Sequence, residues 1–282
     1  MLYMKEFFYA LLTSLLAVMS CTQEPPRFKP IENNSRDLVY TFTKENHGID
    51  LTIYFPTEET NIRVAVIACP GGSYSSHGAH EGAVWAPYFN QLGVAFAVLE
   101  YTLPNGDPSK PIDDMERALS ILYSNADQWL IDRDKIGVMG FSAGGHLACY
   151  AATTADYPED LRPDFQILVY PVVTMSTGTH AGSRTNLLGS NPTSEEIRKY
   201  SNELWVTSAT PKAFITYAKS ETVVPPVYNG KAFYDAMKAA GADAELVELE
   251  GTKHGWSHGN SDHEELYLQP MKAKLTPWLR GL

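Results

Sequence analysis

One short segment of the 282-residue chain constrains its fold more than any other: the G-x-S-x-G pattern at Gly140–Gly144. It follows the apolar run Lys135–Met139 and precedes Gly145–Ala152, a stretch of small and apolar residues typical of a packed helix. The pattern requires a tight strand-to-helix turn that lifts the serine hydroxyl out of the chain, and only small neighbours permit that turn. The segment therefore predicts a strand, a sharp turn and a helix, with Ser142 as a candidate nucleophile.

Five continuous apolar runs predict strands that are buried on both faces, as in a parallel sheet covered by helices. They are Val64–Ala68, Ala95–Leu99, Ile136–Met139, Ile167–Tyr170 and Ala213–Tyr217. Helical patterns fall between and after them, at 82–92, 113–126, 144–154, 227–240 and from Glu264 onward. Strands that alternate with helices predict a doubly wound α/β fold, with a mostly parallel central sheet and helices on both faces.

Two other regions depart from this alternation. Leu38–Phe42 and Leu51–Phe55, on either side of a turn at Gly48, predict an antiparallel hairpin. The stretch 175–210 is rich in Gly, Ser, Thr and Asn and predicts an insertion over the active-site edge of the sheet. The length and the 44% hydrophobic content suit one large domain, which we place at 37–282.

The N-terminus predicts export. Lys5 precedes the apolar stretch Phe7–Val18, which is too short for a transmembrane helix, so 1–20 is predicted to be a signal peptide. The four residues that end at Cys21 resemble a bacterial lipoprotein box, and Cys21 is the predicted lipid anchor; an ordinary secretory signal is the alternative. Pro-rich 21–36 is predicted to be a tether. We expect a protein held at the bacterial outer membrane through this anchor alone.

Charge and cysteine content make a nucleic-acid partner and a disulfide less favoured. The net charge of −11 disfavours binding to a phosphate backbone, so no nucleic-acid partner is expected. Cys69 ends a predicted strand and Cys149 lies on the helix after the turn. Both are predicted to be packed free thiols, and a disulfide between them is the less favoured alternative.

A serine hydroxyl is a weak nucleophile until a base takes its proton, so the chain must supply a histidine after the serine. Of the eight histidines, His254, His258 and His263 follow the last predicted strand, Ala244–Leu249. We predict His254 as the base, because it lies in the loop just past that strand and its neighbour Gly255 allows close approach of the backbone.

The acid that orients this histidine is expected after the preceding strand. Glu221 occupies the loop after Ala213–Tyr217, and it would accept the Nδ1–H bond of the base and stabilise the imidazolium. Asp243 and Glu248 are weaker candidates, because the first lies in a turn and the second on an alternating strand face.

Negative charge on a tetrahedral intermediate needs hydrogen-bond donors. The predicted donors are the backbone N–H of Ala143, directly after the nucleophile, and those of Gly72 and Ser73 in the loop after the first buried strand. The Gly71–Gly72 pair lets the chain turn these amides inward; an ordinary strand-end turn is the alternative reading.

Other side chains near these loops are assigned by residue type. Candidate substrate contacts are Tyr74, Trp256 and His180. Sugar contacts from His77, His80, Glu81 and His180 are considered, with solvated surface residues as the favoured reading of all four. Trp85 is predicted to pack in the core, whereas Trp205 and Trp256 are considered as stacking surfaces for a sugar ring.

Several motifs, taken together, carry a family likeness: Cys69–Gly72, His80–Gly82, Gly140–Ala148, Asn186–Gly189 and His254–Trp256. The chain from about Val64 to Trp278 resembles the bacterial α/β-hydrolase family of acetyl-xylan and feruloyl esterase-like carbohydrate esterases. The resemblance implies a Ser, Asp and His triad, hydrolysis of esters on plant polysaccharides, and no metal or cofactor. This chain departs from the pattern at Glu221, where such enzymes usually have Asp, so the acid is either substituted or displaced.

The sequence therefore predicts an exported serine esterase that removes acetyl groups from xylan, with a small ester or acylated oligosaccharide as substrate. A prolyl-oligopeptidase-like peptidase shares the G-x-S-x-G turn, but we rank it lower because no propeller or other gating domain precedes the hydrolase segment. A glycan-binding homologue with weakened catalysis is the third reading, motivated by the unusual acid.

Overall fold

The computed structural model describes residues 38–154, 157–258 and 263–282, so the predicted signal peptide, the tether and Cys21 lie outside the described residues. Eight strands form one sheet in the order β1-β2-β4-β3-β5-β6-β7-β8. They are β1 (Val39–Phe42), β2 (Leu51–Tyr54), β3 (Ala65–Cys69), β4 (Ala95–Leu99), β5 (Ile136–Phe141), β6 (Phe165–Val169), β7 (Lys212–Ala218) and β8 (Ala244–Leu249).

The strands from β4 to β8 in this order pair in parallel, whereas β2 pairs antiparallel to both of its neighbours, β1 and β4. The predicted mostly parallel sheet and its N-terminal hairpin are therefore confirmed. The two hairpin strands are joined by the short helix α1 (Lys44–His47), which ends at Gly48 in the left-handed conformation, φ +70°.

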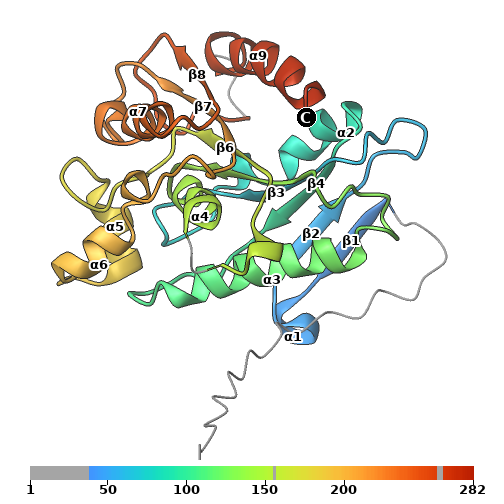
Figure 1. Cartoon of the computed structure of the whole chain (residues 1–282), viewed down its shortest axis with the longest axis horizontal. Coiled ribbons are helices and arrows are strands. Elements are labelled where there is room, and N and C mark those ends of the chain that lie inside the picture. The colour runs from blue at the N-terminus through green and yellow to red at the C-terminus, as the bar shows by residue number, and fades with distance from the viewer. Residues whose placement is uncertain (1–37, 155–156, 259–262) are drawn as a thin grey trace, which may run out of the picture.

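Helices cover both faces of this sheet, with α2 and α9 on one side and α3 and α4 on the other (Figure 1). The longer helices are α2 (Ala86–Gln91), α3 (Ser109–Asn125), α4 (Ser142–Thr153), α5 (Ala181–Leu188), α6 (Ser194–Lys199), α7 (Gly230–Ala240) and α9 (Gln269–Arg280). Single-turn segments are η1 (Ala79–Glu81), η2 (Ala83–Trp85), η3 (Glu159–Leu161), η4 (Asn202–Leu204), η5 (Pro226–Tyr228) and η6 (Glu264–Leu268). The layers are those of an α/β hydrolase.

The core lies between the sheet and these helices. Strands β3, β4, β5 and β6 are buried along their whole length, as their continuous apolar runs predicted. Helix α4 is buried at every residue but its last, because its small side chains let it lie close against the sheet. Cys69 and Cys149 are buried free thiols, as predicted.

Helix boundaries shift most where proline or glycine interrupts the pattern. Helix α3 begins at Ser109, before its predicted start, because Pro111 in the first turn removes an N–H that has no partner within the helix. The helix predicted over 82–92 is divided into η2 and α2, and that over 227–240 becomes η5 followed by α7.

The chain order of the strands places two loops together. From β3 the chain passes to β4 on one side, whereas β5 lies on the other side of β3. Loops at the carboxyl ends of strands diverge at such a reversal and leave a crevice between them. The loop after β3 carries Gly72 and Ser73 and the turn after β5 carries Ser142, so the predicted site residues meet at this point.

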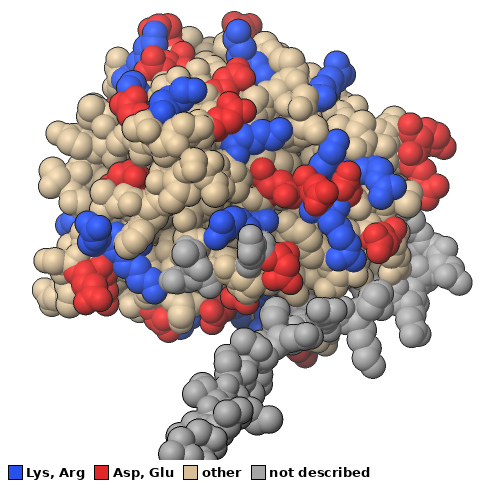
Figure 2. Space-filling view, in the orientation of Figure 1, with Lys and Arg blue, Asp and Glu red and all other residues tan. Residues whose placement is uncertain are grey.

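The predicted insertion contains α5, α6 and η4, and α5 and α6 project together at one end of the molecule (Figure 1). On the face in Figure 2, Lys and Arg side chains are interspersed with Asp and Glu rather than gathered by sign. None of the helices in the described ranges is both long and apolar enough to cross a membrane.

Candidate active site

The turn around Ser142 has the strained geometry that its sequence predicted. Ser142 is the first residue of α4, directly after β5, and its φ is +50°, a conformation that non-glycine residues rarely adopt. A Cβ on Gly140 would lie 2.2 Å from the carbonyl oxygen of Gly144, and one on Gly144 would lie 2.1 Å from that of Cys69. Backbone contact therefore requires glycine at both ends of the motif.

A hydrogen-bonded chain of three side chains begins at this serine. The Oγ atom of Ser142 lies 2.8 Å from Nε2 of His254, and Nδ1 of His254 lies 2.5 Å from Oε2 of Glu221. In the neutral imidazole, Nδ1–H donates to the carboxylate and Nε2 accepts from the serine hydroxyl. The three residues come from loops after β5, β8 and β7, so the predicted set is brought together by the carboxyl ends of three strands.

The acid is buried beneath the histidine. Glu221 is 4% exposed. Burial raises the pKa of its carboxyl group, while the hydrogen bond and charge of His254 and the backbone N–H of Val224 act in the opposite direction. The backbone N–H of Ser220 donates to the carbonyl of Gly251 at 3.0 Å, which ties the acid loop to the histidine loop. This bond joins the two loops that carry the acid and the base.

The rival candidates lie elsewhere. Glu248 accepts a hydrogen bond from the Tyr217 hydroxyl at 2.9 Å, and Asp243 is exposed. The ring of His258 packs on Trp85 with centroids 4.7 Å apart, and that of His263 packs on Tyr267.

The loop after β3 lies against the nucleophile. The N–H of Gly71 donates to Oε2 of Glu81 at 2.7 Å, so this amide is engaged away from the substrate. Gly72 and Ser73 follow with φ of +126° and +58°. Ala143 is the second residue of α4, where N–H groups have no acceptor within the helix. The arrangement leaves the amides of Gly72, Ser73 and Ala143 as the predicted donors, and their role stays a prediction.

Tyr74 is not a substrate contact, which corrects the sequence-based assignment. It is 1% exposed, and its hydroxyl lies 2.9 Å from Nδ1 of His146, whose Nε2 lies 2.7 Å from the carbonyl oxygen of Tyr200. Because a carbonyl only accepts, Nε2 carries the proton and Nδ1 accepts from the tyrosine. Burial lowers the pKa of His146 to about 4, so the imidazole is neutral and anchors the end of the loop.

Trp256 also departs from its prediction. It is fully buried and stacks on Tyr267, with ring centroids 5.3 Å apart and an interplanar angle of 14°, so it supports the His254 loop from behind and offers no face to a sugar. Trp85 is buried, as predicted, and donates from Nε1 to Oγ of Ser257 at 2.9 Å. Trp205 is 42% exposed, with Arg198 over its ring.

The insertion contributes two residues to the site. His180 caps α5 through its side chain, and the nearby His254 contributes, after burial, to lowering its pKa. Its role as a substrate contact stays a prediction. Asn186 on α5 donates from Nδ2 to the carbonyl of Ser73 at 2.8 Å and so fixes the loop after β3. The sequence placed Asn186 in a family motif but did not predict that it would fix this loop.

Four residues, His77, His80, Glu81 and His180, were predicted to be solvated surface residues. The prediction is confirmed for His80, which is exposed, and is wrong for Glu81. Glu81 is 3% exposed, whereas His77 and His180 are half-buried. Alternation of exposed and buried residues in this Gly-rich loop follows no helical or strand period, so the sequence carried no signal for the burial of Glu81.

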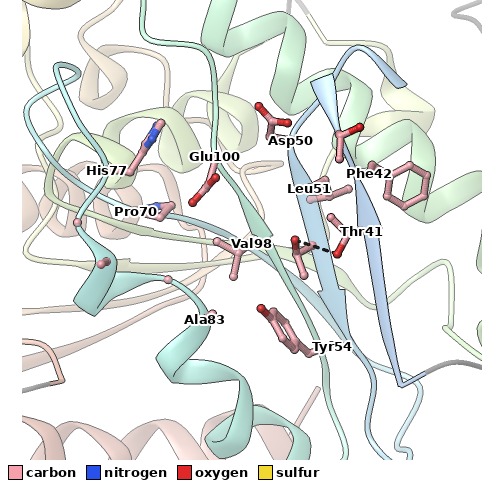
Figure 3. A pocket seen from close by; sticks show the side chains of 15 residues that line it. Thr41, Phe42, Asp50, Leu51, Tyr54, Pro70, His77, Ala83, Val98 and Glu100 are labelled. Atoms are coloured by element: carbon pink, nitrogen blue, oxygen red, sulfur yellow. Dashed lines mark hydrogen bonds between the residues drawn. The ribbon is translucent and has the colours of Figure 1, made fainter. Parts of the chain in front are cut away.

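A separate cavity of about 460 Å³ lies between the β1–β2 hairpin and the segment 77–83 (Figure 3). Glu100, His77, Tyr54, Val98 and Pro70 are among the residues that line it. Because none of the three hydrogen-bonded side chains lines it, we do not place the reaction there. Within the described ranges no group of three or more His, Cys, Asp or Glu side chains is arranged to hold a metal ion.

Comparison with known proteins agrees with this fold. A model of the BD-FAE family matches residues 51–237, more than half of the chain. The chain belongs to the BD-FAE family. The likeness to esterase-like α/β hydrolases seen in the sequence is therefore confirmed.

Two relatives of this BD-FAE member have names that refer to xylan. An acetylxylan esterase of Xylanibacter ruminicola is 36% identical over 250 residues, covering 86% of this chain and 50% of that protein. An endo-1,4-beta-xylanase B of Butyrivibrio fibrisolvens is 37% identical over 189 residues, covering 62% of this chain and 30% of that protein. The chain thus spans half or less of these relatives.

Solved structures match over nearly the whole fold. An acetyl ester-xyloside bifunctional hydrolase from Caldicellulosiruptor lactoaceticus superposes with a TM-score of 0.73 at 27% identity, covering 90% of this chain and 95% of that one. A carboxylesterase from Lactobacillus plantarum superposes with a TM-score of 0.70 at 22% identity, covering 83% and 92%, which bears on the fold alone.

Proposed function

We propose that this chain is a serine carboxylic ester hydrolase that removes acetyl groups from acylated xylo-oligosaccharides. The observation that carries the proposal is the continuous hydrogen-bonded chain from Ser142 Oγ through His254 to the buried Glu221. The names of the two relatives and of the 27% identical structure support the choice of substrate.

Acylation begins when Ser142 Oγ attacks the ester carbonyl carbon while Nε2 of His254 takes the hydroxyl proton. The carbonyl oxygen gains the negative charge, which the amides of Ala143, Gly72 and Ser73 bind. His254 then gives its proton to the departing sugar oxygen. The carbon–oxygen bond to the sugar breaks, and an acetyl group is left on the serine.

Deacylation repeats the same steps with water. His254 takes a proton from the water that attacks the acetyl carbon, and it returns this proton to Ser142 Oγ as acetate leaves. Throughout, Glu221 holds Nδ1–H and stabilises the imidazolium that forms twice in each cycle. His180 is proposed to contact the substrate from the start of α5.

The test compares acetate release from acetylated xylo-oligosaccharides, and turnover of p-nitrophenyl acetate, by wild-type protein and Ser142→Ala. The variant should lose activity by at least about 10³-fold, because no other group supplies the nucleophile. Ser190→Ala, at an exposed serine, is the matched control and should keep its rate. Equal rates in wild type and Ser142→Ala would exclude the proposal. Cleavage of proline-containing peptides without ester turnover would favour a peptidase, and xylan binding without turnover a binding protein.

We also propose that the chain is exported and anchored through Cys21, on the sequence pattern described above. A radiolabelled fatty acid should be incorporated into the wild-type protein in bacterial cells and not into Cys21→Ser. Equal labelling of both proteins would exclude the anchor.

A further inference from the structure

Glu81 is a buried acidic side chain beside the nucleophile that the proposed reaction does not use. It lies in η1, ten residues after Gly71, and is 3% exposed. Oε2 accepts from the N–H of Gly71 and Oε1 accepts from the hydroxyl of Tyr170, each at 2.7 Å. His80 Nε2 lies 3.6 Å from Oε1 on the exposed side. Burial of a carboxyl group costs free energy unless its oxygens accept hydrogen bonds. The donors of Gly71 and Tyr170 therefore stabilise Glu81 in its buried position.

The first donor belongs to the loop that carries the predicted oxyanion donors. A Cβ on Gly71 would lie 2.7 Å from Glu81 Oε2 and 3.0 Å from Cβ of Ser142, so Gly71 sits between the carboxyl group and the nucleophile. The carbonyl of Gly71 accepts from the N–H of Gly78 at 2.9 Å. Gly71 is thus held on both sides, and the direction of the next amide, Gly72, follows from it.

The second donor belongs to the surface on which the base lies. The ring of Tyr170 meets the imidazole of His254 edge to face, with centroids 4.9 Å apart, and it meets Trp256 at the same distance. Burial, followed by the charge of Glu81, raises the pKa of the Tyr170 phenol, which therefore keeps its proton and donates it. Tyr170 has φ of +37°, a backbone conformation that is uncommon for an aromatic residue.

We propose that Glu81 is a positioning residue that fixes the oxyanion loop and the base relative to each other. One carboxyl group joins the loop after β3 to the aromatic wall against His254, so the amides of Gly72 and Ser73 and the imidazole keep one spacing around Ser142. The inference rests on the proposed function. A displacement of about 1 Å between such groups costs about 10²-fold in rate.

The experiment measures kcat and KM for p-nitrophenyl acetate together with the inhibition constant of phenylboronic acid, which forms a tetrahedral adduct with the serine. Glu81→Leu removes both acceptors and should lower kcat by about 10²-fold, with KM within about threefold of wild type. The inhibition constant should weaken in parallel with kcat, because the adduct uses the same donors. A role in stability alone would not move this constant.

Two conservative variants complete the test. Glu81→Gln keeps an acceptor for Gly71 and offers an amide to the Tyr170 oxygen, so kcat should stay within about tenfold of wild type. Tyr170→Phe keeps the ring wall and removes one donor, and kcat should fall about tenfold. Glu248→Leu is the matched control, since Glu248 also accepts from a tyrosine hydroxyl, but on the β7–β8 surface, and kcat should not change.

The outcomes separate the two proposals. Wild-type turnover that does not depend on Ser142 would overturn the proposed function and this inference with it. Ser142-dependent turnover that Glu81→Leu leaves within about twofold, with an unchanged boronic acid constant, would overturn the inference alone. If Glu81→Leu shows no cooperative unfolding transition, Tyr170→Phe decides, and wild-type kcat in that folded variant would overturn the inference.

Discussion

Two buried glutamates lie near the candidate site, and they have different partners. Glu221, 4% exposed, contacts the imidazole of His254, a group that becomes charged during the proposed reaction. Glu81, 3% exposed, accepts from a backbone amide and a tyrosine hydroxyl, which stay neutral. The same type of side chain thus has two uses: Glu221 stabilises a transient charge on the imidazole, and Glu81 holds two fixed donors in place.

The loops around the two glutamates are held in place in different ways. On the acid side, backbone bonds such as that from Ser220 to Gly251 join two loops at the strand ends. On the oxyanion side, side chains anchor the loop in addition to its backbone bonds, with Asn186 bound to Ser73 and Tyr74 bound to His146. We therefore expect variants on the acid side to act mainly by removing the charge of Glu221. Variants on the oxyanion side should act mainly by changing the conformation of the loop after β3.

The largest effect is expected on the acid side. Glu221→Gln keeps the size of the side chain but removes the charge that stabilises the imidazolium, and kcat should fall by about 10³- to 10⁴-fold. Steady-state kinetics on p-nitrophenyl acetate measure this, with Asp243→Asn at the exposed rival position as the control. A Glu221→Gln enzyme that retains more than about a tenth of the wild-type kcat would remove Glu221 as the acid and break the comparison.

The next effect concerns stability on the oxyanion side. Folding lowers the pKa of His146 from 6.5 to about 4. Between these values the unfolded chain binds a proton that the folded chain does not, so stability is fully present above about pH 6.5 and is lost as the pH falls toward 4. The loss from this group is about 3 kcal/mol.

Urea unfolding of wild type and His146→Gln at pH 7.5 and pH 4 measures this contribution as a difference. The subtraction is needed because burial raises the pKa of Asp164 to about 6, which changes stability in the opposite direction in both proteins. An identical pH dependence in the two proteins would show that His146 titrates freely and that the loop end is not anchored by a neutral imidazole.

A purely steric change comes third. The added methyl of Gly71→Ala would lie 2.7 Å from Glu81 Oε2 and 2.8 Å from the carbonyl oxygen of Phe141, so the loop must move away from Ser142. We expect kcat to fall by about 10²-fold. Gly241→Ala is the control: Gly241 has φ of +75° and no neighbouring atom within 4 Å, so it should lose about 1 kcal/mol of stability and no activity. Equal kcat in both variants would contradict a close fit of the loop.

The smallest effect is expected at the insertion. Asn186→Ala removes the donor to the carbonyl of Ser73 and should lower kcat about tenfold, because Gly71 remains held by Glu81. Asn191→Ala, an exposed asparagine of the same insertion, should behave as wild type in the same assay. A loss at Asn186 as large as that of Glu81→Leu would place control of the loop in the insertion instead.

The sequence predicted those parts of the site that depend on short-range order. The turn at Ser142 follows from its own glycines and neighbouring strand, and His254 and Glu221 follow from their places after successive strands. Tyr74, Trp256 and Glu81 were assigned to the wrong environments, because in loops without a repeating period the neighbours of a side chain in sequence do not determine what it packs against.

By itself, then, the sequence determined the order of strands and helices, the strained serine turn and the histidine and acid that follow it, since each depends on local backbone preferences and apolar runs. Only the tertiary structure decided that Glu81 is buried between Gly71 and Tyr170 and that Trp256 turns inward onto Tyr267. These contacts join segments far apart in the chain, and their burial exists only after the sheet has brought the loops together.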